Sequence, residues 1–202
     1  MSRLLETIKL FNKQLCNLEY HQKRFNKARK DLFGLSDELD LSSLIKIPTS
    51  ISNSLFKVRI IYSDVIHDIE FHPYGMRAIN SLQIVNGDGI DYAYKYEDRS
   101  SFQKLLCKCT ADDILIVKNG LITDSSYSNF AFLEKGKFYV PSSYLLNGTK
   151  RQKLLAEKVV TEKNITLDSI FDYEKIFLIN SMIDIQDQIG ISINQIKGTE
   201  SL

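Results

Sequence analysis

The sequence is poor in the features that mark several large classes of protein. Its three cysteines, Cys16, Cys107 and Cys109, form neither an even set nor a CxxC pair, which excludes an obvious disulfide framework. Basic and acidic residues nearly balance, 26 against 25, for a formal net charge of +1. Such a chain has no overall field to attract nucleic acid or an anionic membrane. We therefore expect neither as a partner, and we expect a reducing cytoplasm as the compartment.

Long apolar runs and several well-known motifs are also absent. No stretch approaches the roughly 20 apolar residues that cross a bilayer, and no N-terminal segment resembles an export signal. The sequence contains no GxSxG, Walker A or GxGxxG motif, so serine hydrolases and P-loop enzymes lack their anchors. The three histidines, His21, His67 and His72, lack metal-ligand spacing, and no metal site is expected. We expect His21 to help pack or orient its helix.

What is present suits a folded α+β protein. Hydrophobic residues make up 44% of the 202 residues, enough for one compact unit or two small lobes. In the first part of the chain we expect a hairpin at Asn12-Lys13, a helix over about residues 18–33 ending at Gly34, and two strands joined at Ser63-Asp64. These elements predict an α+β first lobe.

A glycine-rich turn at residues 86–89 is the best boundary in the chain, which predicts lobes of residues 1–88 and 89–202. Along the second lobe the pattern predicts a helix over about 98–109, a strand at 113–120, a strand at 121–126, a hairpin at 129–140, a helix from Gly148 through Val160, a short helical segment at 168–173 and a strand at 175–181.

Two charged residues fall where the pattern predicts little water. Lys95 stands between Tyr94 and Tyr96 in "DYAYKYEDRSSF", which otherwise alternates like a half-buried strand, and Asp124 lies in an apolar strand after a tight turn. A buried charge is costly unless it is neutralised or paired. The residues alone leave three alternatives open: a ligand between the charges, a direct salt bridge, or a lysine stem whose ammonium reaches water.

Four sequence blocks, in this order and spacing, resemble one enzyme superfamily over about residues 4–185. The blocks are "LLETIKL" with "YHQKRFNKA", "YAYKYEDRSSF", "GLITDSSYSNFAF" and "YLLNGTKRQKLL". They are similar to class IV aminotransferases, the fold-type IV enzymes that use pyridoxal 5'-phosphate (PLP). The resemblance implies a two-lobed α/β (α+β) fold of the D-amino-acid aminotransferase type, in a shortened form, with PLP in the cleft between the lobes. It also implies a homodimer with two-fold symmetry. Because Met1 almost directly precedes the "ETI" strand, we expect the upstream segment of other members to be missing.

The resemblance gives roles to residues that would hold the cofactor. Lys95 matches the lysine that forms a Schiff base with PLP, and a desolvated amine of lowered pKa is a suitable nucleophile. Asp124 matches the carboxylate that faces the pyridine nitrogen, where the family usually has glutamate. With the shorter side chain, the ring would sit deeper, a water would intervene, or the electron sink would be weaker. Arg24 matches the arginine that binds the phosphate.

The same resemblance places the phosphate at a helix N-terminus. Gly148, Thr149 and Lys150 match the turn whose backbone N–H groups bind this anion. Lys150 stands where the aminotransferases commonly have threonine, and a lysine there would not supply that hydroxyl contact. Ser181, on the last predicted strand, would offer its hydroxyl to the phosphate. Asn129 matches a family asparagine that we expect to bond backbone across a turn.

Two further residues are candidates to bind a small-molecule amine substrate. Arg59 would meet a substrate carboxylate, or else it is an exposed arginine at a strand edge. Tyr94 would line the pocket, or else it packs in the core.

Two details favour a lyase within the superfamily. "LLNGTKR" is closer to the lyase pattern NGxxR than to PGITR, and "FLINSMIDI" is similar to the lyase "NALMPV". The hypothesis is a 4-amino-4-deoxychorismate lyase, which releases 4-aminobenzoate and pyruvate, with Lys95 abstracting the substrate proton. The alternative is transamination of a branched-chain or D-amino acid. A third hypothesis is a dimeric PLP-binding module with little turnover, against which the presence of both Lys95 and Asp124 argues.

Overall fold

A computed structural model describes residues 2–198 of the chain. The chain folds into two compact units, each with more contacts within it than to the other. Unit 1 comprises Met1–Met76 and Tyr94–Asp98, and unit 2 comprises Arg77–Ala93 and Arg99–Leu202. The predicted junction between residues 88 and 89 falls inside unit 2, and the chain instead passes between units at 76/77, 93/94 and 98/99. Lys95, expected in the C-terminal lobe, lies in unit 1.

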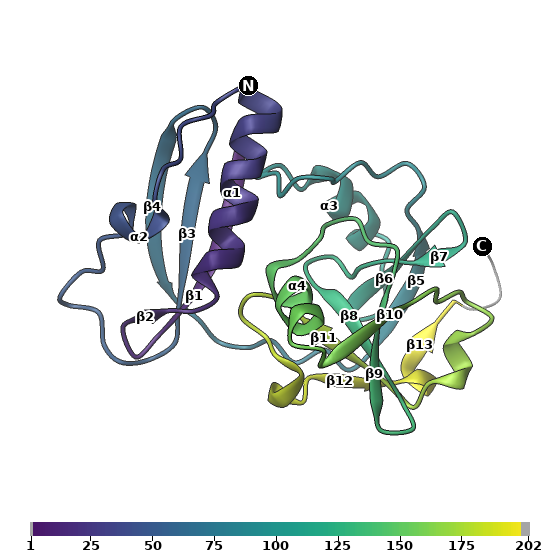
Figure 1. Ribbon diagram of the computed structural model, residues 1–202. Coiled ribbons are helices and arrows are strands. Elements are labelled where there is room, and N and C mark those ends of the chain that lie inside the picture. The colour runs from purple at the N-terminus through teal and green to yellow at the C-terminus, as the bar shows by residue number, and fades with distance from the viewer. Residues whose placement is uncertain (1, 199–202) are drawn as a thin grey trace. The chain divides into compact units, whose positions relative to one another are not determined.

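Unit 1 is a four-stranded antiparallel sheet with one long helix packed on it, as Figure 1 shows. The strand order is β2-β1-β3-β4. Its elements are β1 (Leu4–Phe11), β2 (Gln14–Leu15), α1 (Leu18–Phe33), α2 (Leu41–Leu44), β3 (Phe56–Tyr62) and β4 (Ile66–Pro73). The predicted hairpins and the helix over residues 18–33 are confirmed.

The pattern of β1 explains how the helix and sheet pack. Every second residue, from Leu4 to Leu10, is fully buried, and this face shares a core with Phe25 and Ala28 of α1. The turn at Asn12-Lys13 has two positive φ angles, 49° and 60°, the geometry favoured in two-residue hairpins. Gly34 ends α1 in the left-handed region, with φ of 70°.

The segment Tyr94–Asp98 joins unit 1 because it pairs with the free edge of β1. The N–H of Leu5 donates to the carbonyl of Lys95 at 2.9 Å, and Leu4 lies opposite Tyr96 in an antiparallel bridge. The N–H of Tyr96 also donates to the carbonyl of Tyr94 at 2.9 Å, which makes Lys95 the central residue of a γ-turn. The expected regular strand is therefore a bridge and a tight turn at this point.

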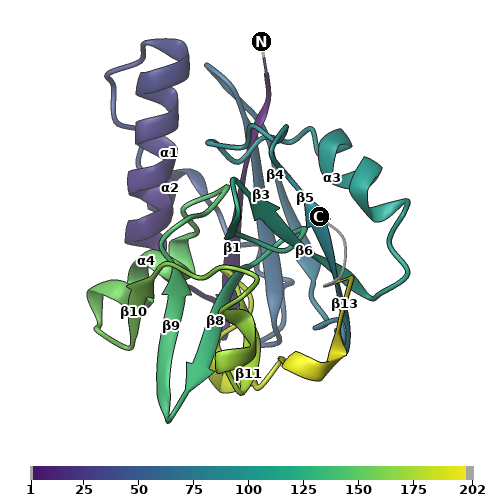
Figure 2. The same ribbon diagram turned by 90° about the vertical axis from the view of Figure 1, so that its right-hand side faces the viewer.

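Unit 2 contains two sheets, of strand orders β10-β9-β8-β11-β12 and β13-β5-β6-β7, seen from a second side in Figure 2. The strands are β5 (Leu82–Asn86), β6 (Asp113–Lys118), β7 (Leu121–Ile122), β8 (Asn129–Glu134), β9 (Lys137–Pro141), β10 (Val160–Lys163), β11 (Lys175–Ile179), β12 (Gly190–Ser192) and β13 (Ile196–Lys197). The helices are α3 (Ser100–Leu106) and α4 (Thr149–Ala156), with 3₁₀ turns η1 (Ile170–Asp172), η2 (Ile185–Asp187) and η3 (Ile193–Gln195).

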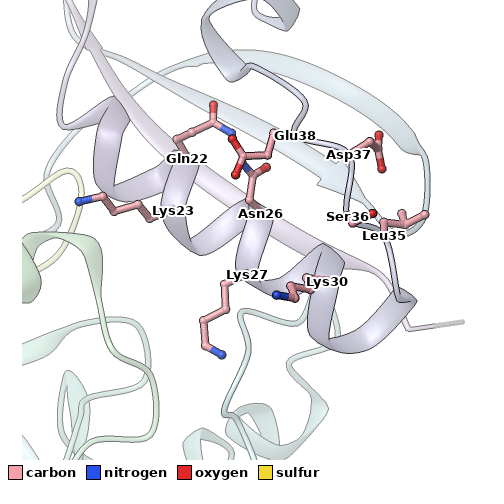
Figure 3. A pocket seen from close by; sticks show the side chains of 9 residues that line it. All are labelled: Gln22, Lys23, Asn26, Lys27, Lys30, Leu35, Ser36, Asp37 and Glu38. Atoms are coloured by element: carbon pink, nitrogen blue, oxygen red, sulfur yellow. The ribbon is translucent and has the colours of Figure 1, made fainter.

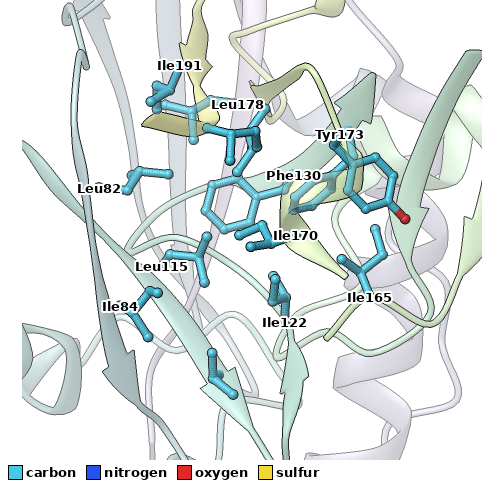
Figure 4. Packing of buried hydrophobic residues seen from close by; sticks show 14 of the residues in the cluster. Leu82, Ile84, Leu115, Ile122, Phe130, Ile165, Ile170, Tyr173, Leu178 and Ile191 are labelled. Carbon is cyan, nitrogen blue, oxygen red and sulfur yellow. The ribbon is translucent and has the colours of Figure 1, made fainter. Parts of the chain in front are cut away.

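The two sheets of unit 2 bury one hydrophobic cluster. Figure 4 shows Leu82 and Leu115 of one sheet together with Phe130 and Leu178 of the other. All four side chains are fully buried. Burying a side chain of this size stabilises a fold by about 1.5–3 kcal/mol, so this cluster is the main support of the strands that carry the site residues of unit 2.

Three predicted elements of unit 2 differ from the structure. The helix expected to run to Val160 ends at Ala156, since Lys158 has a φ of 57° and the β-branched residues after it form β10. The strand expected over residues 121–126 is reduced to β7, and Asp124 forms an isolated bridge with Asn129. The helical segment at 168–173 is the 3₁₀ turn η1. Across residues 2–198, none of the helices has the length and apolar character needed to span a membrane.

Candidate functional site

Asp124 of unit 2 is a buried carboxylate held by three N–H groups. It follows β7 and is 5% exposed. The side-chain amide of Asn129 donates to Oδ1 at 2.7 Å, and the backbone N–H groups of Leu145 and Leu146 donate to Oδ2 at 3.1 and 2.9 Å. A carboxylate has about four acceptor positions. Within the described chain, one position on Oδ1 therefore remains for a further donor.

The environment of Asp124 raises the pKa of its carboxyl above the ordinary value. Burial raises its pKa, while the hydrogen bonds from Leu146, Asn129 and Leu145 and the charge of Arg151 lower it, for a net rise to about 6. A carboxyl group of this kind can share a proton with a weakly basic nitrogen, such as that of a pyridine ring. The residue therefore fits the role that the resemblance gives it.

Asn129 connects Asp124 to the N-terminus of α4. Its amide donates to the carbonyl of Leu146 at 2.9 Å as well as to Asp124. Its Oδ1 lies so close to Gly148 that an ideal Cβ on that residue would be 2.0 Å away. Asp124 and the predicted phosphate-binding turn thus belong to one hydrogen-bonded assembly, and the turn needs glycine at this position for space.

The first turn of α4 is buried, and its long side chains bind other parts of unit 2. The ammonium of Lys150 bonds to the carboxylate of Asp184. The guanidinium of Arg151 donates to the carbonyl of Pro141 at 3.0 Å, binds the carboxylate of Glu162 and lies 4.5 Å over the ring of Tyr144. What this turn offers an anion is therefore its backbone N–H groups and the positive end of the helix dipole.

Ser181 is half-buried just after β11. Its neighbour Asn180 donates to the hydroxyl of Ser128 at 2.8 Å, in the turn between Asp124 and Asn129. This bond connects the chain beside Ser181 to the Asp124 assembly. Its role toward a phosphate stays a prediction.

Unit 1 contains a second assembly, centred on Glu6 of β1. This carboxylate is 0% exposed and receives three bonds from α1. Arg24 donates from Nε to Oε1 at 2.8 Å and from Nη2 to Oε2 at 2.6 Å, and Nδ1 of His21 lies 2.6 Å from Oε2. The guanidinium of Arg24 is thus oriented by an internal carboxylate partner, and its role toward a phosphate stays a prediction.

The charges of this assembly act on one another and on Lys95. Burial alone would raise the pKa of Glu6, but the charge of Arg24 and the bonds from His21 and Arg24 lower it to about 2. Burial lowers the pKa of His21, with the charges of Arg24 and Lys95 acting in the same direction and Glu6 opposing them. His21 is therefore neutral and Glu6 ionised at pH 7. The structure brings Arg24 and Lys95 to the same part of unit 1.

The two candidate substrate residues have partners within unit 1. Arg59 donates to Glu70 on the neighbouring strand at 2.6 Å, and His72 contacts the same carboxylate at 2.9 Å. Because β3 lies between β1 and β4, the alternative of an exposed strand-edge arginine is wrong. Tyr94 donates its hydroxyl to Asp31 at 2.9 Å and packs against the core of unit 1. Their roles toward substrate stay predictions.

Unit 1 also has a surface groove of about 430 Å³ between α1 and residues 35–38. Figure 3 shows its lining, in which Lys23, Lys27 and Lys30 lie along the helix and Glu38 lies near Asn26. None of the predicted site residues lines it. Residues 2–198 contain no cluster of histidine, cysteine and acidic side chains that could hold a metal ion.

Glu6 was not predicted as a site residue, and His21 was predicted only to pack or orient its helix. A signal for Glu6 was present, because it is in phase with Leu4, Ile8 and Leu10 on the buried face of β1. An ionisable residue in phase with buried apolar ones needs a partner. No comparable signal marked Arg151, whose partners come from β9, β10 and the loop before α4.

Residues 98–187 match the family described as amino-transferase class IV. An uncharacterized protein of Haemophilus influenzae (strain ATCC 51907 / DSM 11121 / KW20 / Rd) is 36% identical over 185 residues, which cover 90% of this chain and 98% of the relative.

Two solved structures illustrate the likeness of the fold. A "putative 4-amino-4-deoxychorismate lyase" from Haemophilus somnus 129pt superimposes with a TM-score of 0.84 and 31% identity, covering 90% of this chain and 97% of that one. A hypothetical aminotransferase from Mycobacterium tuberculosis, solved in a PLP-bound form, has a TM-score of 0.76 and 18% identity, covering 98% of this chain and 82% of that one. The second likeness is one of fold alone.

Proposed function

The chain belongs to the class IV aminotransferase family, and from this premise we propose that it is a PLP-dependent lyase that converts 4-amino-4-deoxychorismate to 4-aminobenzoate and pyruvate. The observation that carries the cofactor assignment is the assembly of Asp124, Asn129 and Gly148. It joins a carboxylate with one open acceptor position to a glycine turn at a helix N-terminus. The lyase is preferred to an aminotransferase because the 31% identical structure bears the lyase name.

The residues of this chain would bind the cofactor at three points. The resemblance assigns phosphate binding to Arg24 in unit 1 and, in unit 2, to the backbone N–H groups at the start of α4. Asp124 would hold a proton at the ring nitrogen, which its pKa near 6 and its open acceptor position permit. Lys95 would carry the aldehyde carbon. PLP, when bound, supplies an electron sink for the carbon next to the substrate amine.

Lys95 would then act as the general base of the reaction. Its amine would take the proton from the amine-bearing carbon of the substrate. The bond between the ring carbon and the enolpyruvyl oxygen would break, the leaving enolate would take up a proton to become pyruvate, and the ring would become aromatic 4-aminobenzoate. For an aminotransferase the same lysine would move this proton to the cofactor instead.

The test begins with cofactor attachment. Purified protein mixed with PLP and reduced with borohydride should gain the mass of the cofactor on the peptide that contains Lys95, and Lys95→Ala should not. Release of 4-aminobenzoate from 4-amino-4-deoxychorismate would then support the lyase. Conversion of bound PLP to its amine form by a panel of amino acids would support the aminotransferase, and bound PLP that no substrate consumes would support a binding module. The family also motivates our proposal of a homodimer, which light scattering would measure.

A further inference from the structure

Glu6 is the most deeply buried charge in the neighbourhood of Lys95, and its partners come from one helix. At 0% exposure an unpaired carboxylate would be strongly destabilising. His21 and Arg24 lie one turn apart on α1, and both reach this carboxylate. The sequence therefore places a charge inside unit 1 and surrounds it with matching donors.

The geometry of the pair fixes the direction of Arg24. Its Nε and Nη2 each meet a different oxygen of Glu6, at 2.8 and 2.6 Å, and such a two-point contact sets the plane of the guanidinium. His21 holds Oε2 at the same time, so the carboxylate cannot turn without losing a bond. Arg29, on the same helix, differs because its carboxylate partner Asp37 is 59% exposed.

Strand β1 connects this arginine to the lysine. Leu5, the residue before Glu6, donates its N–H to the carbonyl of Lys95 at 2.9 Å. The charge of Lys95 in turn acts on His21. Two adjacent residues of one strand thus hold the backbone of Lys95 and the side chain of Arg24, which sets the distance between that backbone and that side chain.

We infer that Glu6 is a positioning residue, which holds Arg24 in the orientation that binds the phosphate group of the cofactor at a set distance from Lys95. The inference rests on the proposed PLP function and adds to it a residue that does not touch the cofactor. It predicts that Glu6 matters for the phosphate end of the ligand and not for the ring or the aldehyde.

The experiment measures affinity for PLP and for pyridoxal, which lacks the phosphate, by fluorescence titration. The dissociation constant for pyridoxal divided by that for PLP is a ratio that reports phosphate recognition alone, and it falls when the phosphate is bound less well. Glu6→Asp keeps the charge but shortens the side chain by one methylene, so the two-point contact cannot form. We expect the ratio to fall about tenfold, the equivalent of one charge-assisted hydrogen bond. Arg24→Met gives the lower limit of the ratio.

Two variants control for stability and for arginine pairing in general. Ile60→Val lies in the same core on the strand beside Glu6 and should lower the melting temperature without changing the ratio. Asp37→Asn removes the partner of Arg29 and should leave the ratio unchanged. Glu6→Gln is measured beside them, since it removes the charge that Glu6→Asp keeps.

The outcomes separate the inference from the proposed function. An unchanged ratio in Glu6→Asp would show that the role of Glu6 is purely structural. A higher ratio in Glu6→Gln would show that Glu6 is a counter-charge that weakens phosphate binding. Either result overturns the inference, while PLP binding by the parent protein stands. Failure of the parent protein to bind PLP at all would overturn the proposed function and this inference together. Should Glu6→Asp not fold, His21→Gln, which removes the second anchor of the carboxylate, is expected to lower the same ratio.

Discussion

Asn129 and Gly148 lie so close together that a Cβ atom on residue 148 would be 2.0 Å from Oδ1 of the asparagine. The contact is possible only because residue 148 has no side chain. Through Asn129 it connects the start of α4 to Asp124. Asp124 and the start of α4, the two parts of unit 2 proposed to bind the cofactor, are therefore held in one arrangement.

Gly148→Ala should lower the free energy of unfolding by about 1–3 kcal/mol, because Asn129 must move and its bonds to Asp124 and Leu146 are strained. It should also weaken PLP binding. Gly89→Ala is the matched control, since a Cβ there meets open space and its φ is not in the left-handed range. Denaturant unfolding of the two variants checks the prediction, and equal stabilities would contradict it.

Asp124 should make the protein less stable as the pH rises. Its pKa is raised from 3.8 to about 6 by burial, against the opposing hydrogen bonds. A group of raised pKa contributes its full stability below the unfolded value, here 3.8, and loses it as the pH rises through 6. Relative to Asp124→Asn, the free energy of unfolding of the parent should fall by about 3 kcal/mol between pH 3.5 and 7. Parallel pH profiles would contradict this assignment.

Glu6 should have the opposite effect at lower pH. Its pKa falls from 4.5 to about 2 because the charge of Arg24 and the bonds from His21 and Arg24 outweigh the effect of burial. The stability it contributes is present above pH 4.5 and is lost as the pH falls toward 2. Relative to Glu6→Gln, the parent should lose about 2 kcal/mol between pH 7 and 3. Urea unfolding at fixed ionic strength measures both proteins. A difference in free energy of unfolding that stays constant with pH would contradict the prediction.

Arg151 should matter more for stability than the half-buried Lys153 of the same helix. It is 2% exposed and bonds to Pro141, Asn147 and Glu162. Arg151→Met should cost about 1–3 kcal/mol, since it leaves the carbonyl of Pro141 without this donor, whereas the half-exposed Glu162 can turn to water. Lys153→Met, on the same helix, loses only an ion pair to Glu157 and should cost less than about 1 kcal/mol. Thermal unfolding of both variants gives the comparison.

Much of the fold followed from local patterns. The helix of residues 18–33 has an apolar repeat and a terminal glycine, and the hairpin at Asn12-Lys13 separates two extended pieces, so each signal is contained within a few residues. The end of α4 did not follow. Helical and strand propensities compete between Ala156 and Val160, and pairing of β10 with β9 decides the outcome.

The candidate site was predictable only where the signal lies within a short stretch of sequence. Lys95 and Asp124 were identified because each is a charge among apolar or aromatic residues in the sequence, and the structure buries Asp124 but leaves Lys95 half-buried. The unit that contains Lys95 could not be deduced, because its backbone bond to Leu5 joins residues 90 positions apart. The same holds for Glu6 and Arg24, whose pairing depends on how α1 lies on the sheet. The sequence shows that a buried carboxylate and an arginine are present, but not that they form a pair.

The return of Tyr94–Asp98 to the edge of β1 has a consequence for synthesis of the chain. On the ribosome, residues 2–76 emerge before residues 94–98 and can form α1 and most of their sheet. The outer edge near Leu5 stays open until residue 98 has left the exit tunnel, while β5 waits longer for β6. The lysine segment is therefore the closing piece of the first unit, and completing that unit and beginning the second are consecutive events in translation.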